Sequence, residues 1–485
     1  MTAVRRSGIV ALAGALALAI AAVILNTPAL APGAFNWAEP GNVAAALAQG
    51  RGFSDPFGGG TGPTAWVPPL PVALEASVFL AFGVKTAASA KALVVISTCG
   101  LAAANALLVF ALRRSATPLA IIASAVFVGL SIGLSDGPMR VLSEAWLDLL
   151  LSAALLWAAL EVGGESRHGA SRVLVVASAA AALTDAGLAL AALVVAAALA
   201  FAARDEAFVR RAALAAGAAA VLSAGAWTAR NAAVFHRLVP LKSNFWFELH
   251  LANVASADGL PRAETVLHSL PFFDAGQFER YSSLGEIKYV DSFRAPTIAA
   301  IAAAPSHFAA NIGRRLANAL IFCRHDGGAV LTRGHFDAGD LQLLAGAGLL
   351  LPAGAPDRAF WTRIDMPPVR ARVAVGALHL ADPDGVWRNW AACRLDYDAQ
   401  FGGMTNLGVG FLTAGVPTLA LLLAALRGRG GLPRSARWAA VIGGAMALPY
   451  ILVNHNDRHQ LPLLAMQAVV MGTCVQAWVE RPRKP

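Results

Sequence analysis

Residues 173–203 read VLVVASAAAALTDAGLALAALVVAAALAFAA, an apolar run whose only charged side chain is Asp185. As one α-helix this run would extend about 47 Å, which exceeds the roughly 30 Å hydrocarbon core of a bilayer. Basic residues flank it on both sides, Arg172 before and Arg204 after. Because positive charges stay on the cytoplasmic side, the pattern favours two short spans joined by an outer turn at Asp185.

The composition of the whole chain agrees with a lipid environment. Its 485 residues are 57% hydrophobic and 14% charged, whereas soluble domains carry about 25% charged residues. The formal net charge of +9 comes from arginines grouped at the ends of apolar runs, and no nucleic-acid-binding motif is present. The charge therefore indicates membrane topology and not a phosphate-binding face.

Other apolar runs of helical length occur along the chain. They cover residues 8–25, 92–112, 118–134, 141–160, 212–227, 407–426, 439–453 and 461–479. The first run also resembles a signal-peptide core, but an uncleaved span is preferred because many spans follow. With the N-terminus inside, every short basic loop falls on one side. The sequence predicts an all-α polytopic membrane protein with about ten transmembrane helices and both termini in the cytoplasm.

This threading divides the chain into three parts. Residues 1–229 form an N-terminal transmembrane module whose first outer loop covers 26–91. Residues 230–404 form an outer segment of mixed structure with juxtamembrane helices and a strand at 369–380. Residues 405–485 supply the C-terminal transmembrane helices.

The four cysteines do not indicate a metal site. Cys99 and Cys474 lie in apolar runs and are interpreted as small core residues. Cys323 and Cys393 fall in the outer segment, where a disulfide and two unpaired thiols both fit. No Cys/His spacing is typical of zinc binding.

Several carboxylates fall at the outer face. Glu144 and Asp148 are four residues apart at the outer end of a predicted helix, so they share one face and repel each other. With Asp136 they make a second acidic site. Pairing with Arg140, solvation at the interface and a divalent cation are the alternatives, and the sequence demands none of them. A buried carboxylate in a membrane is costly, which favours a functional or paired role for Asp148.

The first outer loop is rich in Gly, Pro and Trp. Glu39 comes before an Ala-rich helix, followed by GRGF at 50–53, GPTAW at 62–66 and PPLP at 68–71. This pattern resembles the first loop of the GT-C membrane glycosyltransferases, a superfamily that includes protein O-mannosyltransferases and aminoarabinose transferases of lipid A. A plain structured loop is the alternative interpretation.

Two further patches resemble bacterial family-39-like glycosyltransferases. The first reads WTARN at 227–231 and VPLKSN at 239–244, and continues to Glu248 and Asn253. The second, DRHQLP at 457–462, is less specific, since relatives tend to have Arg-Tyr followed by Pro. All three patches together cover about a quarter of the chain.

The resemblance implies an enzyme of a bacterial inner membrane that takes a sugar from a polyprenyl-phosphate carrier and gives it to a glycan, lipid or protein acceptor outside the cytoplasm. Glu39 would be the general base, and a single displacement would invert the anomeric configuration. Binding of substrate and phosphate would fall to Arg230, Asn231, Lys242, Asn244, Glu248 and Arg458. The sequence departs from the family where Ala38 precedes Glu39, since relatives often have two adjacent acids there, and where His459 follows Arg458.

Two other functions remain open from the sequence. A transporter or flippase of a lipid-linked or polar substrate would be expected to show internal repeats and Gly/Pro-broken segments in matching halves, and neither is found. A non-catalytic membrane assembly factor would tolerate joint replacement of Glu39, Asp136 and Glu144.

Overall fold

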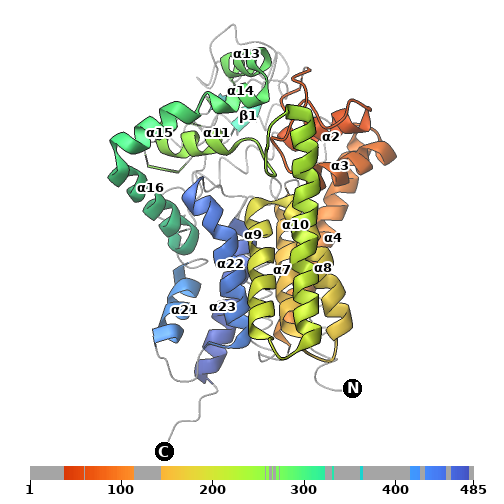
Figure 1. Ribbon diagram of the computed structural model, residues 1–485, viewed down its shortest axis with the longest axis vertical. Coiled ribbons are helices and arrows are strands. Elements are labelled where there is room, and N and C mark those ends of the chain that lie inside the picture. Colours follow the sequence, from red (N-terminus) through yellow and green to blue (C-terminus); the bar gives the residue numbers. More distant parts are fainter. Residues whose placement is uncertain are drawn as a thin grey trace, which may run out of the picture.

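The structure is a computed structural model in which the chain is mostly helical. It describes residues 38–58, 60–113, 144–256, 258–260, 265, 269–271, 274–322, 330–332, 361–363, 415–426, 432–454 and 460–479. Figure 1 shows a bundle of long helices with a head of shorter helices at one end. Within the described residues the only sheet is a two-stranded antiparallel pair, β1 (Val330–Thr332) with β2 (Trp361–Arg363). The strand predicted at 369–380 lies outside the described residues.

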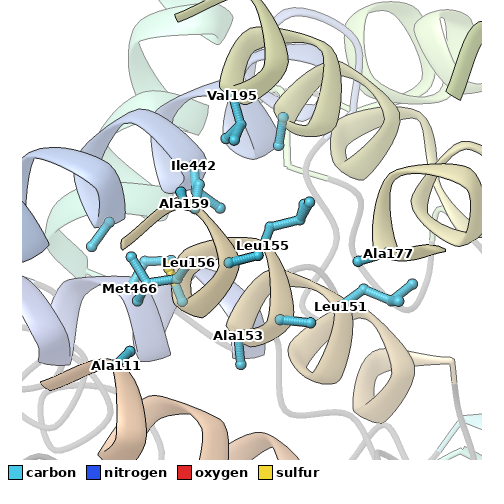
Figure 2. Packing of buried hydrophobic residues seen from close by; sticks show 14 of the residues in the cluster. Ala111, Leu151, Ala153, Leu155, Leu156, Ala159, Ala177, Val195, Ile442 and Met466 are labelled. Carbon is cyan, nitrogen blue, oxygen red and sulfur yellow. The ribbon is translucent and has the colours of Figure 1, made fainter. Parts of the chain in front are cut away.

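The bundle is built around helix α7. The helices of the bundle are α4 (Ala87–Leu112), α7 (Ala145–Glu161), α8 (Arg167–Thr184), α9 (Ala186–Ala202), α10 (Ala207–Phe235), α21 (Val416–Leu426), α22 (Arg434–Leu452) and α23 (Gln460–Val479). Helix α7 packs against α4, α8, α9, α22 and α23. Figure 2 shows its Leu155 and Leu156 among side chains of the neighbouring helices. Many of these neighbours are alanines, whose small side chains let helix backbones approach closely.

The bundle has an apolar outer surface. Helices α4, α10 and α22 are long and apolar enough to cross a membrane. Leu222 on α10 is 71% exposed and Val176 on α8 is 67% exposed. Such a surface suits contact with lipid better than contact with water. Of the ten predicted spans, those at 8–25 and 118–134 lie outside the described residues.

The break predicted at Asp185 is confirmed. Asp185 has extended backbone angles and separates α8 from α9. Its Oδ1 accepts hydrogen bonds from the backbone N–H groups of Gly187 at 2.7 Å and Leu188 at 3.2 Å, which caps the start of α9. The Tyr450 hydroxyl of α22 hydrogen-bonds to the other carboxylate oxygen. The apolar run at 173–203 is therefore part of two helices, α8 and α9, joined by a capped turn at Asp185.

Basic residues gather at the end of the bundle away from the head. Arg113, just after α4, lies 3.4 Å from the Glu161 carboxylate at the end of α7. The Arg167 guanidinium at the start of α8 lies 5.3 Å from the ring centre of Phe208 at the start of α10. The opposite end of α10 enters the head (Figure 1). Arg113 and Arg167, from two of the predicted basic loops, therefore lie at the same end of the bundle.

The head joins the first outer loop to the outer segment. It contains α2 (Ala38–Ala48), α3 (Pro69–Phe82), α11 (Phe245–His250), η2 (Leu251–Ala255), α13 (Ala275–Leu284), α14 (Glu286–Asp291), α15 (Arg294–Ala303), α16 (Pro305–Ala317) and η3 (Asn318–Phe322). Trp66 of the first loop stands 5.1 Å from both Phe57 and Phe247 and 6.2 Å from Tyr281, measured between ring centres. Edge-on aromatic contacts of this kind stabilise a packed core.

One predicted boundary is wrong. Helix α10 has 29 residues, which corresponds to about 44 Å, and it continues to Phe235. The boundary predicted between residues 229 and 230 therefore falls inside a helix. The last turns of α10 carry Arg230 into the head, so bundle and head share one continuous element.

Candidate functional site

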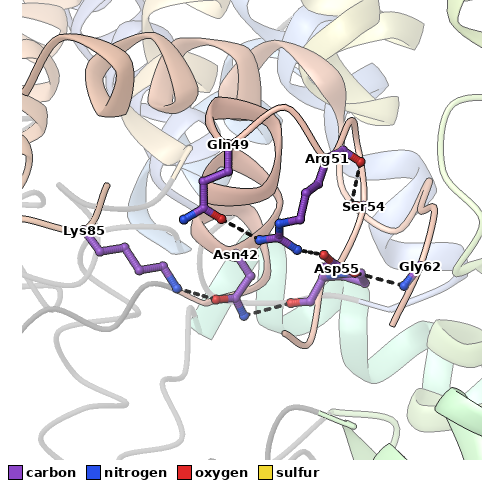
Figure 3. Close-up of polar contacts among 8 residues, drawn as sticks. Asn42, Gln49, Arg51, Ser54, Asp55, Gly62 and Lys85 are labelled. Atoms are coloured by element: carbon purple, nitrogen blue, oxygen red, sulfur yellow. Dashed lines mark hydrogen bonds and ion pairs between the residues drawn. The ribbon is translucent and has the colours of Figure 1, made fainter. Parts of the chain in front are cut away.

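The first outer loop is a folded unit. Asp55 donates its backbone N–H to the Gly62 carbonyl at 2.8 Å, and its Oδ1 accepts from the Gly62 N–H at 3.0 Å. Arg51 forms an ion pair with the same carboxylate (Figure 3). Gly62 has a φ of 87°, a conformation that side chains disfavour. These contacts join Asp55 to Gly62 and to Arg51 and so close this part of the loop.

Glu39, the predicted catalytic base, lies half-buried in the first turn of α2. One turn later, Asn42 donates to the Pro56 carbonyl at 3.0 Å and accepts from the Lys85 ammonium at 2.5 Å (Figure 3). Residues three apart share a helix face, so Glu39 and Asn42 lie on the same side of α2. Glu39 is therefore carried by a helix that is hydrogen-bonded to the middle of the loop at Pro56 and to its later part at Lys85.

Arg230 fastens the first loop to the bundle. Its guanidinium donates to the Thr64 carbonyl at 2.7 Å and to the Phe53 carbonyl at 3.0 Å. It also lies over the rings of Trp227 and Phe53, at 4.9 and 5.3 Å from their centres. Asn231, fully buried, donates to the Val239 carbonyl at 3.1 Å. These contacts favour a positioning role for both residues over the direct phosphate contact that the resemblance implies.

Glu286 fastens the same loop from the other side. Its carboxylate accepts from the Ala65 N–H at 2.7 Å, the Tyr281 hydroxyl at 2.8 Å and the Thr64 hydroxyl. Burial raises the pKa of Glu286, while the Thr64, Ala65 and Tyr281 hydrogen bonds oppose that rise. We call Arg230, Tyr281 and Glu286 the loop brace, because together they hold the 53–65 backbone.

The second acidic site is partly described. Glu144 occupies the N-cap position of α7, and Asp148 is buried in its first turn; Asp136 lies outside the described residues. Glu75 of α3 interacts electrostatically with Glu144. Burial raises the pKa of Glu75 to about 8, with Lys85 opposing the rise and Glu144 adding to it. The Glu75 and Glu144 carboxylates therefore repel each other, and the Lys85 ammonium offsets that repulsion at Glu75.

A polar junction gathers residues from distant parts of the chain. Glu248 accepts from the Asn244 amide at 3.0 Å and from the Asn454 amide at 2.5 Å. Two residues predicted for substrate binding, Asn244 and Glu248, are thus brought together at the outer end of α22. Arg458, also predicted there, lies outside the described residues.

Arg315 is buried beside this junction and bonds to neutral acceptors. Its guanidinium donates to the carbonyls of Ile451 at 2.7 Å and Leu452 at 3.3 Å, and to Asn253 Oδ1 at 3.2 Å. Burial lowers its pKa to about 10, so it remains charged at neutral pH. The carbonyls at the C-terminal end of a helix lack partners within the helix, and Arg315 supplies donors for those of α22.

Lys242 lies in a different place, a cleft of about 360 Å³. The cleft is lined by Arg237, Leu238, Val239, Pro240, Lys242, Ser243, Phe245, Trp246, Ile287, Val290 and Asp291. We call it the 237–246 cleft. It shares no lining residue with the Glu39 face of α2.

Neither a metal cluster nor a disulfide is found within the described residues. No three His, Cys, Asp or Glu side chains gather there as metal ligands would. Cys474 is buried, as predicted for a core residue, whereas Cys99 is exposed. Cys323 and Cys393 lie outside the described residues.

Sequence reasoning missed three residues of these sites. Glu75 is the only charge in α3, and a lone carboxylate in an apolar helix was an available signal. Glu286 stands in EIKYVD, which is typical of an exposed helix. Arg315 follows Arg314 in a segment predicted to lie on the membrane surface, so the pair gave no sign that one of them is buried.

No protein family, curated protein or solved structure matches the chain.

Proposed function

We propose that the chain is an inverting glycosyltransferase of the GT-C type in a bacterial inner membrane. In this proposal about ten helices cross the membrane, both termini are cytoplasmic, and the head faces the opposite compartment. The donor is a polyprenyl-phosphate-linked sugar. The acceptor is a hydroxyl of a glycan, lipid or protein that reaches the head.

One observation carries the proposal. The first outer loop, with Glu39 at its start, is fixed at the head end of an apolar bundle by Arg230 and Glu286. A catalytic carboxylate needs a rigid support, because a displacement of about 1 Å at the reacting atoms lowers the reaction rate strongly. Arg113 and Arg167, which follow α4 and begin α8, lie at the other end of the bundle, which supports a non-cytoplasmic location for the loop.

The proposed chemistry is a single displacement. Glu39 accepts the proton of the acceptor hydroxyl as its oxygen attacks the anomeric carbon. The bond between that carbon and the phosphate oxygen breaks, and the lipid phosphate leaves with the electron pair. Phosphate needs no general acid, only positive charge to stabilise it. Lys242 and Arg458 are the predicted basic residues that are not members of the loop brace, and they are the candidates.

The test supplies purified protein with a panel of polyprenyl-phosphate sugars and measures release of the lipid phosphate. Glu39→Gln should abolish release while leaving the melting temperature unchanged, because the amide keeps the shape and removes the base. Glu279→Gln is the same change at an exposed carboxylate of α13 and should retain activity. If Glu39→Gln keeps full activity, Glu39 is not the general base. Movement of the intact donor across a vesicle membrane without phosphate release would favour a flippase instead.

A further inference from the structure

The wall of the 237–246 cleft is braced from inside the protein. The Trp227 indole N–H donates to the Leu241 carbonyl at 2.8 Å. The Asn231 amide donates to the Val239 carbonyl at 3.1 Å. Both donors belong to the last turns of α10, so the wall is fixed to the longest helix of the bundle.

The same wall holds two unfavourable backbone conformations. His236 and Leu241 have φ values of 51° and 56°, in the left-handed region that residues with a Cβ disfavour. At His236 this conformation ends α10 just before the wall, as left-handed residues commonly end helices. Leu241 lies within the wall, where such a conformation persists only because the surroundings impose it.

The cleft offers an aromatic platform beside paired charges. Trp246 is half-buried and is backed by the Arg294 guanidinium, 5.4 Å from its ring centre. Arg237 forms an ion pair with Asp291, and the two side chains are 42% and 38% exposed. Lys242 adds one more positive charge to the lining.

We infer that the 237–246 cleft is a binding subsite for a saccharide unit. A sugar ring has an apolar C–H face that packs on an indole and an edge of hydroxyls that hydrogen-bond to charged planar groups. Trp246 supplies the platform. Asp291 accepts from hydroxyls and Arg237 donates to them. The volume of about 360 Å³ falls in the range of small-ligand pockets.

A bare phosphate fits this lining less well. Arg237 and Lys242 would attract it, but the Asp291 carboxylate is paired with Arg237 and would repel it. A ligand that carries both hydrogen-bond donors and acceptors can bind to Arg237 and Asp291 while the two remain paired.

This inference rests on the proposed function, in which the bound unit belongs to the acceptor. The cleft adjoins the loop brace: the Ser243 N–H donates to the Ala65 carbonyl at 2.9 Å, and Ile287 follows Glu286 directly. A saccharide in the cleft therefore sits against the braced side of the first loop. The acceptor class would be an oligosaccharide or a glycan-bearing molecule.

The test uses the full chain in a detergent without a sugar headgroup. Maltotriose, mannotriose and chitotriose are the probes, and binding is measured by calorimetry and by saturation-transfer NMR. At least one of them should bind. Trp246→Ala should weaken that binding at least about tenfold, whereas Trp246→Phe should keep it within about threefold. Phe82→Ala, an exposed aromatic of α3, should bind as the unchanged protein does.

The outcomes separate this inference from the proposed function. Absence of binding by all three trisaccharides, or equal binding by Trp246→Ala, overturns the saccharide subsite. So does displacement of the trisaccharide by inorganic phosphate at equal concentration. Trisaccharide binding together with no lipid-phosphate release from any donor keeps the subsite and counts against the glycosyltransferase.

Discussion

The Arg230 guanidinium donates a hydrogen bond to the Thr64 carbonyl at 2.7 Å, across 166 residues of sequence. The contact joins the end of a membrane-length helix to the loop that carries Glu39. A second bond from the same guanidinium reaches Phe53 at 3.0 Å. Arg230 therefore attaches the loop to α10 at two carbonyls, and Trp227 of the same helix packs edge-on against Phe53 at 4.8 Å.

Replacing Arg230 tests this dependence. Arg230→Met should lower the free energy of unfolding by about 2–4 kcal/mol, because two charge-assisted hydrogen bonds are lost and two carbonyls lose their partners. Arg230→Lys should be nearly as destabilising, since an ammonium cannot reproduce the planar fork. Thermal melting and proteolysis of the 50–66 region are the measurements. A lysine variant of normal stability but weak donor binding would point to direct phosphate contact instead.

Glu286 should make stability depend on pH. Burial raises the pKa of Glu286 above its ordinary value of 4.5, so the native state holds the proton more tightly than the unfolded state does. The stabilisation is complete below pH 4.5 and is lost as pH rises through the native pKa. Glu286→Gln removes this ionisation. Melting temperatures from pH 4 to 8 should fall less steeply for Glu286→Gln, and parallel curves for the two proteins would contradict the assignment.

Gly100 should tolerate no side chain. A Cβ added there would lie 2.2 Å from the Trp146 ring, so α4 and α7 approach closely only because position 100 is glycine. Gly100→Ala should destabilise by about 1–3 kcal/mol. Gly225→Ala is the matched control, because nothing lies within 4 Å of a Cβ at that position of α10.

A double replacement identifies the cause of that effect. Gly100→Ala combined with Trp146→Leu should recover part of the lost melting temperature, because the clash disappears with the indole. Additive losses would mean that the glycine matters for another reason.

Local signals in the sequence were sufficient for part of the fold. The break at Asp185 was predictable because a run too long for one span had arginines at both ends. The bundle helices followed from apolar length in the same way. The end of α10 was not predicted: Thr228, Arg230 and Asn231 interrupt the apolar run after Trp227, yet the helix continues to Phe235.

The sites show the same division. Glu39 and Glu248 stand in motifs, so they were found. Asn244, one partner of Glu248, was also predicted, but Asn454 was not, because it lies 206 residues away and one sequence carries no sign of that pairing. Glu286 and Arg315 are ordinary surface types by pattern. Only tertiary contact shows that both are buried and bonded.

Arg315 and Arg314 offer a matched pair for the last prediction. Arg315 is fully buried, and its donors serve the Ile451 and Leu452 carbonyls at the end of α22 and the Asn253 side chain. Arg314 is exposed. Arg315→Met should cost at least about 3 kcal/mol, because several buried carbonyls lose their donors at once. Arg314→Met should change stability by less than about 0.5 kcal/mol.

The two variants should also differ in sugar transfer. Arg315 sets the end of α22, from which Asn454 reaches Glu248, so a surviving Arg315→Met protein should show a raised KM for the lipid-linked donor. Arg314→Met should keep both kcat and KM. Comparable melting temperatures for the two variants would mean that Arg315 does not support α22. Equal KM values for the two would mean that the polar junction takes no part in donor binding.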